Sequence, residues 1–265
     1  MAVSEDIFQF SVAELIRAGL VFLRITGLMF ALPVFGDQPT PVRVRVLMAG
    51  ALTLGLYHLV PSAWGIRVDI DPVAVAWLMI REIMIGLSLG YVAKLMLEGV
   101  LLAAALVGFQ MGFGTAGLLF PEASNEVNGF SAFHRVLVFL FFLGLSLHHV
   151  FIRAIYESFQ LIPAGGAILH AGLGTDLIAW SGGVLVIALE LAAPVLVALL
   201  FTMAALGLIA RTVPQMNVFV MSFPASFFVG MIIYIATMPF YPGWMESYFT
   251  QGREHLFMAL HNLRP

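Results

Sequence analysis

The sequence predicts an all-α protein of the membrane type, with about six apolar helical segments, several of which are broken. Hydrophobic residues make up 61% of the 265 residues and charged residues only 10%, and the mean hydropathy is +1.01. Charged residues make up about 25% of ordinary soluble domains. The apolar residues also fall in long runs, which are separated by short stretches of glycine, proline and polar residues. Such runs are typical of helices that lie in a membrane.

The composition excludes several classes of function. The chain has 12 basic and 15 acidic residues, with Lys94 as its single lysine, so we expect no basic surface for nucleic acid. It has no cysteine, which excludes disulfides, thiolate metal sites and iron–sulfur clusters. His148 and His149 are adjacent, and neighbours on a helix point about 100° apart, so they cannot both ligate one ion. No hydrolase or zinc-protease motif is present. We therefore expect no enzyme, no catalytic or metal-binding residue and no cofactor.

The N-terminal part begins with two predicted helices. Residues 12–35 form the first apolar segment, and it carries Arg17 and Arg24, which are seven positions apart and lie on nearly one helical face. We expect that face to meet protein and not lipid. The second segment, 44–60, follows a break that contains glycine and proline. Residues 1–11 contain no Lys or Arg, so a cleavable signal is not predicted and we expect the mature chain to begin near its first residue.

The third helix is the longest predicted element. Asp71 and Pro72 are an N-cap followed by a proline at the first helical position, and apolar sequence continues to Met111. At 1.5 Å per residue, an unbroken helix would be about 58 Å long, which is twice the ~30 Å of the hydrocarbon core. We therefore expect either a hairpin or a helix that leaves the membrane. Gly86 and Gly90 form a small-xxx-small pattern, which permits close contact with another helix.

Residues 112–129 break the helical pattern and contain a literal G-x-G-x-x-G at 112–117. No strand pattern precedes this motif and no ribose-binding acid follows at the right distance, so a dinucleotide site is not predicted. The motif is better explained as flexible backbone between two helices, carrying bulky apolar side chains. Irregular backbone at membrane depth must be buried in protein or line a cavity. A fourth apolar segment, 130–150, and a mixed stretch, 153–182, come next.

The last third is predicted to be an apolar helical hairpin. Its first arm, 183–210, ends at Arg211 near the negative end of the helix dipole, and Pro214 cannot continue the helix. The second arm, counted over 224–238, would span roughly 22 Å, which is short for a membrane span. Pro239 then ends this arm, and we expect an amphipathic tail after it.

The start of the second arm has two candidate N-caps. Asn217 would leave Pro224 inside the helix, whereas Ser222 would place Pro224 in the first turn, where its missing N–H does no harm. We therefore favour Ser222.

Charged residues inside apolar helices are rare, and they mark charge pairs or functional sites. Lys94 and Glu98 lie one turn apart and can neutralise each other at a subunit contact. Glu190 has no charged neighbour in its own segment, so it needs a partner from elsewhere or a proton, and a proton relay is a second role open to it. The embedded charges that we assign to subunit contacts are Arg17, Arg24, Arg81, Glu82, Lys94, Glu98 and Glu190.

Five groups of residues match a known pattern over nearly the whole chain. They are Phe35-Gly36 with the Pro and Arg residues that follow, Arg81-Glu82 with Gly86, Gln110-Met111-Gly112, Ser158 with Pro163, and the block 214–224 preceded by 189–194. Together these motifs resemble FliR, a membrane component of the bacterial flagellar type III export gate. Ser222 and Ala225 depart from the family pattern, in which we expect a glycine and a more polar residue.

The resemblance implies an organisation and a function. Residues 1–182 would form a FliP-like helical part that includes a channel plug, and residues 183–265 a FliQ-like helical hairpin with a C-terminal tail. The protein would be a subunit of the export gate that helps to form and close the channel through which unfolded flagellar proteins cross the inner membrane. The implied partners are FliP and FliQ subunits in a hetero-oligomer, FlhB, the unfolded export substrates and membrane lipid. The implied location is the bacterial inner (cell) membrane, within the flagellar basal body.

The resemblance also assigns roles to two loops. The first would be a plug inside the channel, in which glycines keep the backbone mobile and large side chains supply bulk; it comprises Gly112, Phe113, Gly114, Thr115, Gly117, Leu118, Leu119 and Phe120. An ordinary buried re-entrant loop is the alternative for this segment. The second would be a cytoplasmic loop at the hairpin tip, near FlhB, with Pro214, Gln215, Met216, Asn217 and Phe219.

The alternative function for the whole chain is a small secondary transporter or channel that uses the embedded carboxylate of Glu190. The broken helices would also suit that class. Dependence on partners separates the two classes, because a transporter should purify as a monomer or symmetric oligomer, whereas a gate subunit should be stable only with other proteins.

Overall fold

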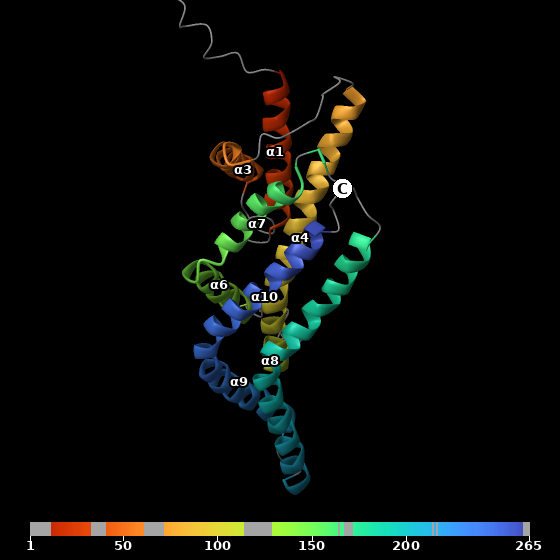
Figure 1. Cartoon of the computed structure of the whole chain (residues 1–265). Helices are drawn as coiled ribbons and strands as arrows, with labels where there is room; N and C mark the ends of the chain where they lie inside the picture. Colours follow the sequence, from red (N-terminus) through yellow and green to blue (C-terminus); the bar gives the residue numbers. More distant parts are fainter. Residues whose placement is uncertain are drawn as a thin grey trace, which may run out of the picture. The chain divides into compact units, whose positions relative to one another are not determined.

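The structure is a computed structural model that describes residues 12–32, 41–60, 72–113, 129–163, 165–166, 172–213, 215 and 217–261. These residues form helices, and no strand occurs among them (Figure 1). Three helices are long and apolar enough to cross a membrane, or up to four if a bent pair, α6 and α7, counts as one span. The predicted all-α, membrane-type fold class is confirmed.

The chain divides into two compact units. Among the described residues, unit 1 contains α1 (Val12–Ala31), α3 (Val42–Tyr57), the first part of α4 (Pro72–Gln110), most of α7 (His148–Leu161) and the end of α10 (Tyr241–His261). Unit 2 contains the rest of α4, α6 (Gly129–Gly144), most of α8 (Gly172–Thr212), α9 (Val218–Thr237), the 3-10 turn η2 (Met238–Phe240) and the start of α10. The predicted division after residue 182 concerns likeness to two other proteins, and it stays a prediction.

In unit 1, α1 and α4 pack with their backbones in direct contact. A Cβ on Gly86 would collide with the carbonyl oxygen of Arg24, and a Cβ on Gly90 would lie 2.5 Å from the Cβ of Ala31. On the facing helix, a Cβ on Gly27 would lie 2.8 Å from the carbonyl oxygen of Ile83. Glycine is therefore required on both helices, as the small-xxx-small pattern predicts for α4.

The long third segment is one helix. α4 begins at Pro72, as the Asp71-Pro72 pair predicts, and runs for 39 residues to Gln110 without a break. The hairpin alternative for this segment is wrong. No residue in the interior of α4 is a proline, and its four interior glycines, at 86, 90, 99 and 108, each face a packed neighbour.

The core of unit 2 is built where α4, α6, α8 and α9 meet. Small residues of α4 and α8, such as Ala103 and Ala192, are fully buried and allow the helices to approach closely. The larger residues Met111, Phe130 and Tyr234 fill the remaining space. The full set of buried residues in this cluster is Ala103, Ala104, Val107, Met111, Phe130, Ala188, Ala192, Val195, Leu199 and Tyr234.

The segment 130–150, which we predicted as one apolar element, contains a sharp break. α6 ends at Gly144 and α7 begins at His148, and the two helices are bent by 60°. Ser146 has a φ of 55°, in the left-handed region that residues with a Cβ seldom adopt, and Leu147 N donates to the carbonyl of Phe142. The single-segment prediction is wrong because the break carries only weak local signals, Gly144 and Ser146, and no proline.

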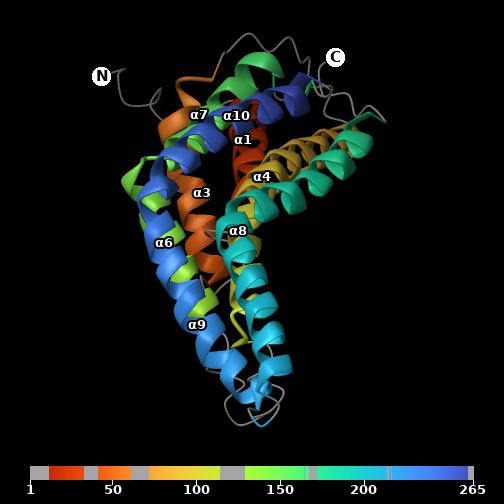
Figure 2. The ribbon, with the colours of Figure 1, turned by 90° about the horizontal axis from the view of Figure 1, so that it is seen from below.

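The hairpin is longer than predicted, and its second arm begins earlier. α8 begins at Gly172, within the stretch predicted as mixed, and continues past Pro194 to Thr212. α8 is bent near its middle (Figure 2), as expected for a helix with an internal proline. The N-cap of α9 is Asn217, whose side chain accepts from the backbone N–H of Val220, so Pro224 lies inside the helix. Our choice of Ser222 as N-cap is therefore wrong, because Asn217 already satisfies a free amide one turn earlier.

The end of α9 agrees with the prediction, but two further helical elements follow it without a loop. α9 ends at Thr237, η2 adds one 3-10 turn, and α10 starts directly at Tyr241. Pro239 and Pro242 fall in the first turns of η2 and α10, where a missing N–H is harmless.

Candidate functional site

Arg24 and Glu82 form a buried ion pair in unit 1. Arg24 Nε and Nη2 donate to Glu82 Oε2 and Oε1, at 2.6 and 3.0 Å, so the pair is bidentate. Both side chains are at most 1% exposed. The guanidinium also lies over the ring of Phe159, 4.2 Å from its centroid. A buried charge is tolerated when it is paired and hydrogen-bonded, and this pair meets both conditions.

The segment at the end of α7 completes the network around this pair. Arg24 Nη1 donates to the carbonyl of Ile162 at 3.0 Å and to Ser158 Oγ at 3.2 Å. The backbone N–H of Gly165 donates to Glu82 Oε1 at 2.6 Å. The network therefore joins α1, α4 and the chain that follows α7.

The sequence predicted that Arg24 faces protein, and the structure places it against α4 and α7 of its own chain. The assignment of Arg24 and Glu82 to subunit contacts stays a prediction. The sequence did not predict the partner, because Arg24 and Glu82 are 58 positions apart.

The second predicted cation on α1, Arg17, lies closer to the surface of unit 1. Its Nη2 donates to the carbonyl of Val60 at 2.7 Å, and its guanidinium lies 5.0 Å from the centroid of the Tyr57 ring. Arg17 thus holds the end of α3 against α1. The prediction that this face of α1 meets protein is confirmed for Arg17 as well.

The remaining predicted charges lie along α4 and α8. Arg81 is half-buried and stands 5.5 Å from the ring centroid of Trp77, one turn earlier on α4. Lys94 and Glu98 are half-buried, one turn apart. Their mutual pairing, and the role of these residues in subunit contacts, stay predictions.

The predicted plug begins directly after α4, and only its first two residues are described. Gly112 has a φ of 98°, in the left-handed region that favours glycine. Phe113 stacks on Phe130 with ring centroids 5.9 Å apart and meets Phe227 edge-on at 5.8 Å. Phe113 is therefore held between α6 and α9, at the edge of the unit 2 core. The other predicted plug residues lie outside the described residues: Gly114, Thr115, Gly117, Leu118, Leu119 and Phe120.

The hairpin tip presents polar side chains to the outside. Figure 2 shows the end of α8 and the start of α9 converging. Gln215 and Asn217 are exposed, and Asn217 Oδ1 accepts from Val220 N at 3.3 Å. Asn217 therefore has a structural role as a cap in addition to any role in the loop. Of the other predicted tip residues, Pro214, Met216 and the side chain of Phe219 lie outside the described part of the chain.

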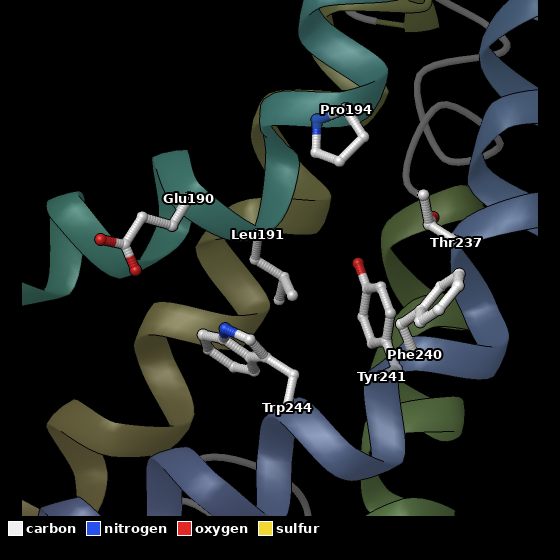
Figure 3. Close-up of a pocket in the computed structure, with 7 residues that line it drawn as sticks. All are labelled: Glu190, Leu191, Pro194, Thr237, Phe240, Tyr241 and Trp244. Carbon is white, nitrogen blue, oxygen red and sulfur yellow. The ribbon is translucent and has the colours of Figure 1, made fainter.

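A pocket opens between α8 and the junction of α9 with α10, within unit 2 (Figure 3). Its volume is about 210 Å³. Figure 3 shows Leu191, Tyr241 and Trp244 pointing into this space, whereas the carboxylate of Glu190 points outward, away from Tyr241. The residues that line the pocket are Glu190, Leu191, Pro194, Thr237, Phe240, Tyr241 and Trp244. The pocket is mainly apolar, with a single carboxylate at its edge.

The inner wall of the pocket is fixed by a buried aromatic cluster that the sequence did not predict. His134 Nδ1 and the hydroxyl of Tyr234 are hydrogen-bonded at 2.7 Å. The ring of Tyr241 meets His134 edge-on, with centroids 5.7 Å apart, and lies 6.3 Å from Tyr234. His134 and Tyr234 are 100 positions apart, so no local pattern could link them. Tyr241 belongs both to this cluster and to the pocket wall.

A metal site is not found in the described part of the chain. No group of three or more His, Asp or Glu side chains there is placed to hold an ion.

The sequence matches one protein family over most of its length. The family described as bacterial export proteins, family 1, matches residues 15–252. Flagellar biosynthetic protein FliR of Bacillus subtilis (strain 168) is 32% identical over 222 residues, which cover 83% of this chain and 85% of that protein. FliR of Pectobacterium carotovorum subsp. carotovorum is 31% identical, covering 87% of each chain. FliR of Escherichia coli (strain K12) is 28% identical, covering 91% of this chain and 88% of its own.

These relatives confirm the resemblance that the motifs indicated. Their names describe a component of flagellar export and assembly, which is a transport function and not an enzymatic one. The apolar helices agree with a membrane protein that works with other flagellar export components. The chain belongs to the bacterial export proteins, family 1, the family of the flagellar biosynthetic protein FliR.

Proposed function

We propose that this chain is a subunit of the flagellar type III export gate, and that it helps to form and close the channel through which unfolded flagellar proteins cross the inner membrane. In this proposal the chain assembles with FliP and FliQ subunits in the flagellar basal body. The tip of its hairpin faces FlhB on the cytoplasmic side.

The observation that carries the proposal is the uncovered apolar surface of the hairpin. In the most apolar 18-residue window of α8, only 22% of the window is buried, and in the run from Val220 to Met258 only 17%. The corresponding share in α4 is 56%. Apolar patches of this extent belong to contacts with lipid or with other proteins.

The position of the Glu190 carboxylate indicates that part of this apolar surface contacts another protein and not lipid. Glu190 is exposed near the middle of α8, in a helix whose hydropathy is 2.7. Charged side chains at membrane depth almost always face protein or a water-filled cavity, because hydrocarbon cannot solvate them. A neighbouring subunit would supply such an environment, which agrees with the family membership of the chain.

Copurification tests the assembly part of the proposal. The tagged chain should be recovered with FliP and FliQ subunits when they are produced together, and it should aggregate or be degraded when it is produced alone. The partners are identified by mass spectrometry of the material that elutes with the tag. A stable, monodisperse protein purified alone in detergent would count against the gate and would favour a small transporter.

The closing role rests on the segment that follows Phe113. Phe113 packs against Phe130 and Phe227, so the chain is anchored where it leaves α4. We propose that residues 114–120, which include Leu118, Leu119 and Phe120, supply the bulk that blocks the channel, and that the glycines let this bulk move aside when a substrate arrives.

A deletion and a replacement of equal length test this closing role. Deleting residues 114–120 spares the anchoring side chain of Phe113, and replacing them by glycine and serine keeps the length while removing the bulk. Both variants should assemble and make cells leaky to ions and small molecules in the absence of an export substrate. If both lose assembly and the surviving complexes show no leak, the segment is a structural loop and the plug assignment is wrong.

A further inference from the structure

We propose that the pocket at Glu190 receives a basic side chain, lysine or arginine, from a neighbouring protein subunit. The pocket comprises Glu190, Leu191 and Pro194 of α8 together with Thr237, Phe240, Tyr241 and Trp244. This inference rests on the proposed function, because it requires a protein partner beside the hairpin. It adds the place and the chemistry of one contact in that assembly.

The first argument is the charge of Glu190. The structure gives its carboxylate no hydrogen bond or ion pair with another described residue. Unit 2 has two basic residues of its own, Arg135 and Arg211. Arg211 is 21 residues further along α8, which corresponds to roughly 30 Å of helix. Arg135 is exposed on α6, and no ion pair joins it to Glu190. The carboxylate is therefore available to a cation from outside.

The second argument is the backbone beside this carboxylate. Pro194 has no N–H, so it cannot donate to the carbonyl of Glu190, which lies four residues earlier in α8. One residue thus offers two kinds of acceptor, a carboxylate and a carbonyl that its own helix does not use in the regular way. A group with several N–H donors can bind both. Lysine has three such donors and arginine five.

The third argument is the aromatic wall. Phe240, Tyr241 and Trp244 line the pocket opposite α8 (Figure 3). Trp244 stacks on Tyr248 with centroids 5.0 Å apart, and the ring of Tyr241 is fixed against His134. A cation is attracted to the face of an aromatic ring, and most strongly to tryptophan. Because the carboxylate of Glu190 points outward at the edge of the pocket, we place the cation at the pocket mouth, between this carboxylate and the aromatic wall.

The size and the charge of the lining select a protein side chain over a lipid. At about 210 Å³ the pocket is smaller than the ~300–1,000 Å³ of typical small-molecule sites, so it suits a single side chain. None of the described residues that line it is basic. The phosphate of a phospholipid headgroup would therefore lie beside a carboxylate without a counter-charge, whereas a lysine or arginine side chain brings a positive charge alone.

Photo-crosslinking in the assembled complex tests this inference. A photoreactive benzoylphenylalanine replaces Phe240, which is 74% exposed at the edge of the pocket. The complex is irradiated in membranes of cells that produce the export components, and the cross-linked peptide is identified by mass spectrometry. We expect a peptide of a partner subunit that contains an arginine or lysine. Glu190→Gln in the same background keeps the shape and removes the charge, and it should reduce the cross-link about tenfold or more.

Two further variants complete the test. Glu246→Gln is the matched control, because Glu246 is an exposed carboxylate on α10 that does not line the pocket, and it should leave the cross-link unchanged. Glu190→Arg should abolish the cross-link, and reversing the charge of the identified basic residue should restore it.

Several results would overturn the inference. They are a cross-link to lipid, a partner peptide without a basic residue, or equal effects of Glu190→Gln and Glu246→Gln. These results differ from a failure of the proposed function, in which the chain without any substitution would recover no export component at all. If the complex assembles normally and Glu190→Gln leaves the cross-link unchanged, the pocket inference is refuted and the gate proposal remains intact.

Discussion

Removing the carboxylate of Glu82 should destabilise unit 1 strongly. Glu82→Ala leaves the guanidinium of Arg24 buried at 1% exposure without its counter-charge, and it removes the acceptor of the Gly165 N–H. Breaking a buried ion pair by deleting one partner costs about 3–5 kcal/mol, because the remaining charge stays uncompensated. With a shift of about 2–4 °C per kcal/mol for chains of this size, the midpoint of thermal unfolding should fall by roughly 6–20 °C.

The pair on α7 provides a matched control for this prediction. Arg153 Nε donates to Glu157 Oε1 at 3.0 Å, but the Arg153 side chain is 68% exposed. Exposed helical pairs contribute about 0.3–0.5 kcal/mol, so Arg153→Ala should move the midpoint by no more than a few degrees. The double variant Arg24→Met with Glu82→Leu should recover much of the loss, because it removes both charges together.

The measurement is the soluble fraction of the tagged chain after heating the copurified assembly in mild detergent, followed by immunoblotting. The midpoint is compared among the four proteins at equal detergent concentration. If Glu82→Ala and Arg153→Ala shift the midpoint equally, burial does not set the energy of the Arg24–Glu82 pair and the reasoning fails.

Two further predictions concern the helix contact in unit 1 and the hairpin tip. Gly86→Ala should destabilise the fold by about 1–3 kcal/mol in the same heating assay, because its Cβ would collide with the backbone of Arg24. Gly19→Ala is the control: nothing lies within 4 Å of the new Cβ, so stability should be unchanged or slightly raised. Equal effects of the two substitutions would contradict the close packing of α1 and α4. Replacing Gln215, Met216 and Asn217 by alanine should impair export, scored as motility on soft agar, while leaving the complex assembled. Because Asn217 caps α9, a companion variant with Asn217→Ser keeps the cap, and normal motility in both would remove the tip from the mechanism.

The sequence alone predicts the features that depend on composition and on short local motifs at helix ends. The fold class follows from hydropathy, and the start of α4 follows from the Asp71-Pro72 pair, because both signals lie within a few residues of the feature that they predict. The buried position of Arg24 also followed from the sequence, since an arginine inside an apolar helix must find protein.

Features that depend on packing could not be predicted. The break between α6 and α7 is marked in the sequence only by Gly144 and Ser146, without a proline, and it is stabilised by the contacts of residues such as Phe142. The choice between Asn217 and Ser222 as N-cap turned on whether a helix tolerates an internal proline, and membrane helices do so when their neighbours satisfy the freed backbone groups. The partners of Arg24 and the cluster around His134 come from segments far apart in the chain, and a single sequence carries no signal for such pairs.

The contacts of Phe113 constrain how a plug of this kind could open. Phe113 is packed between Phe130 and Phe227, and Phe130 in turn meets Tyr234 edge-on at 5.0 Å in the core of unit 2. Phe113 is half-buried, so exposing it would cost a part of the about 1.5–3 kcal/mol for a fully buried phenylalanine, and each aromatic pair adds about 0.5–1.5 kcal/mol. If residues 114–120 act as the proposed plug, a movement that leaves Phe113 in place would avoid this cost. Opening should then leave the core of unit 2 intact, and the anchor at Phe113 would return the plug to the same place after each substrate has passed.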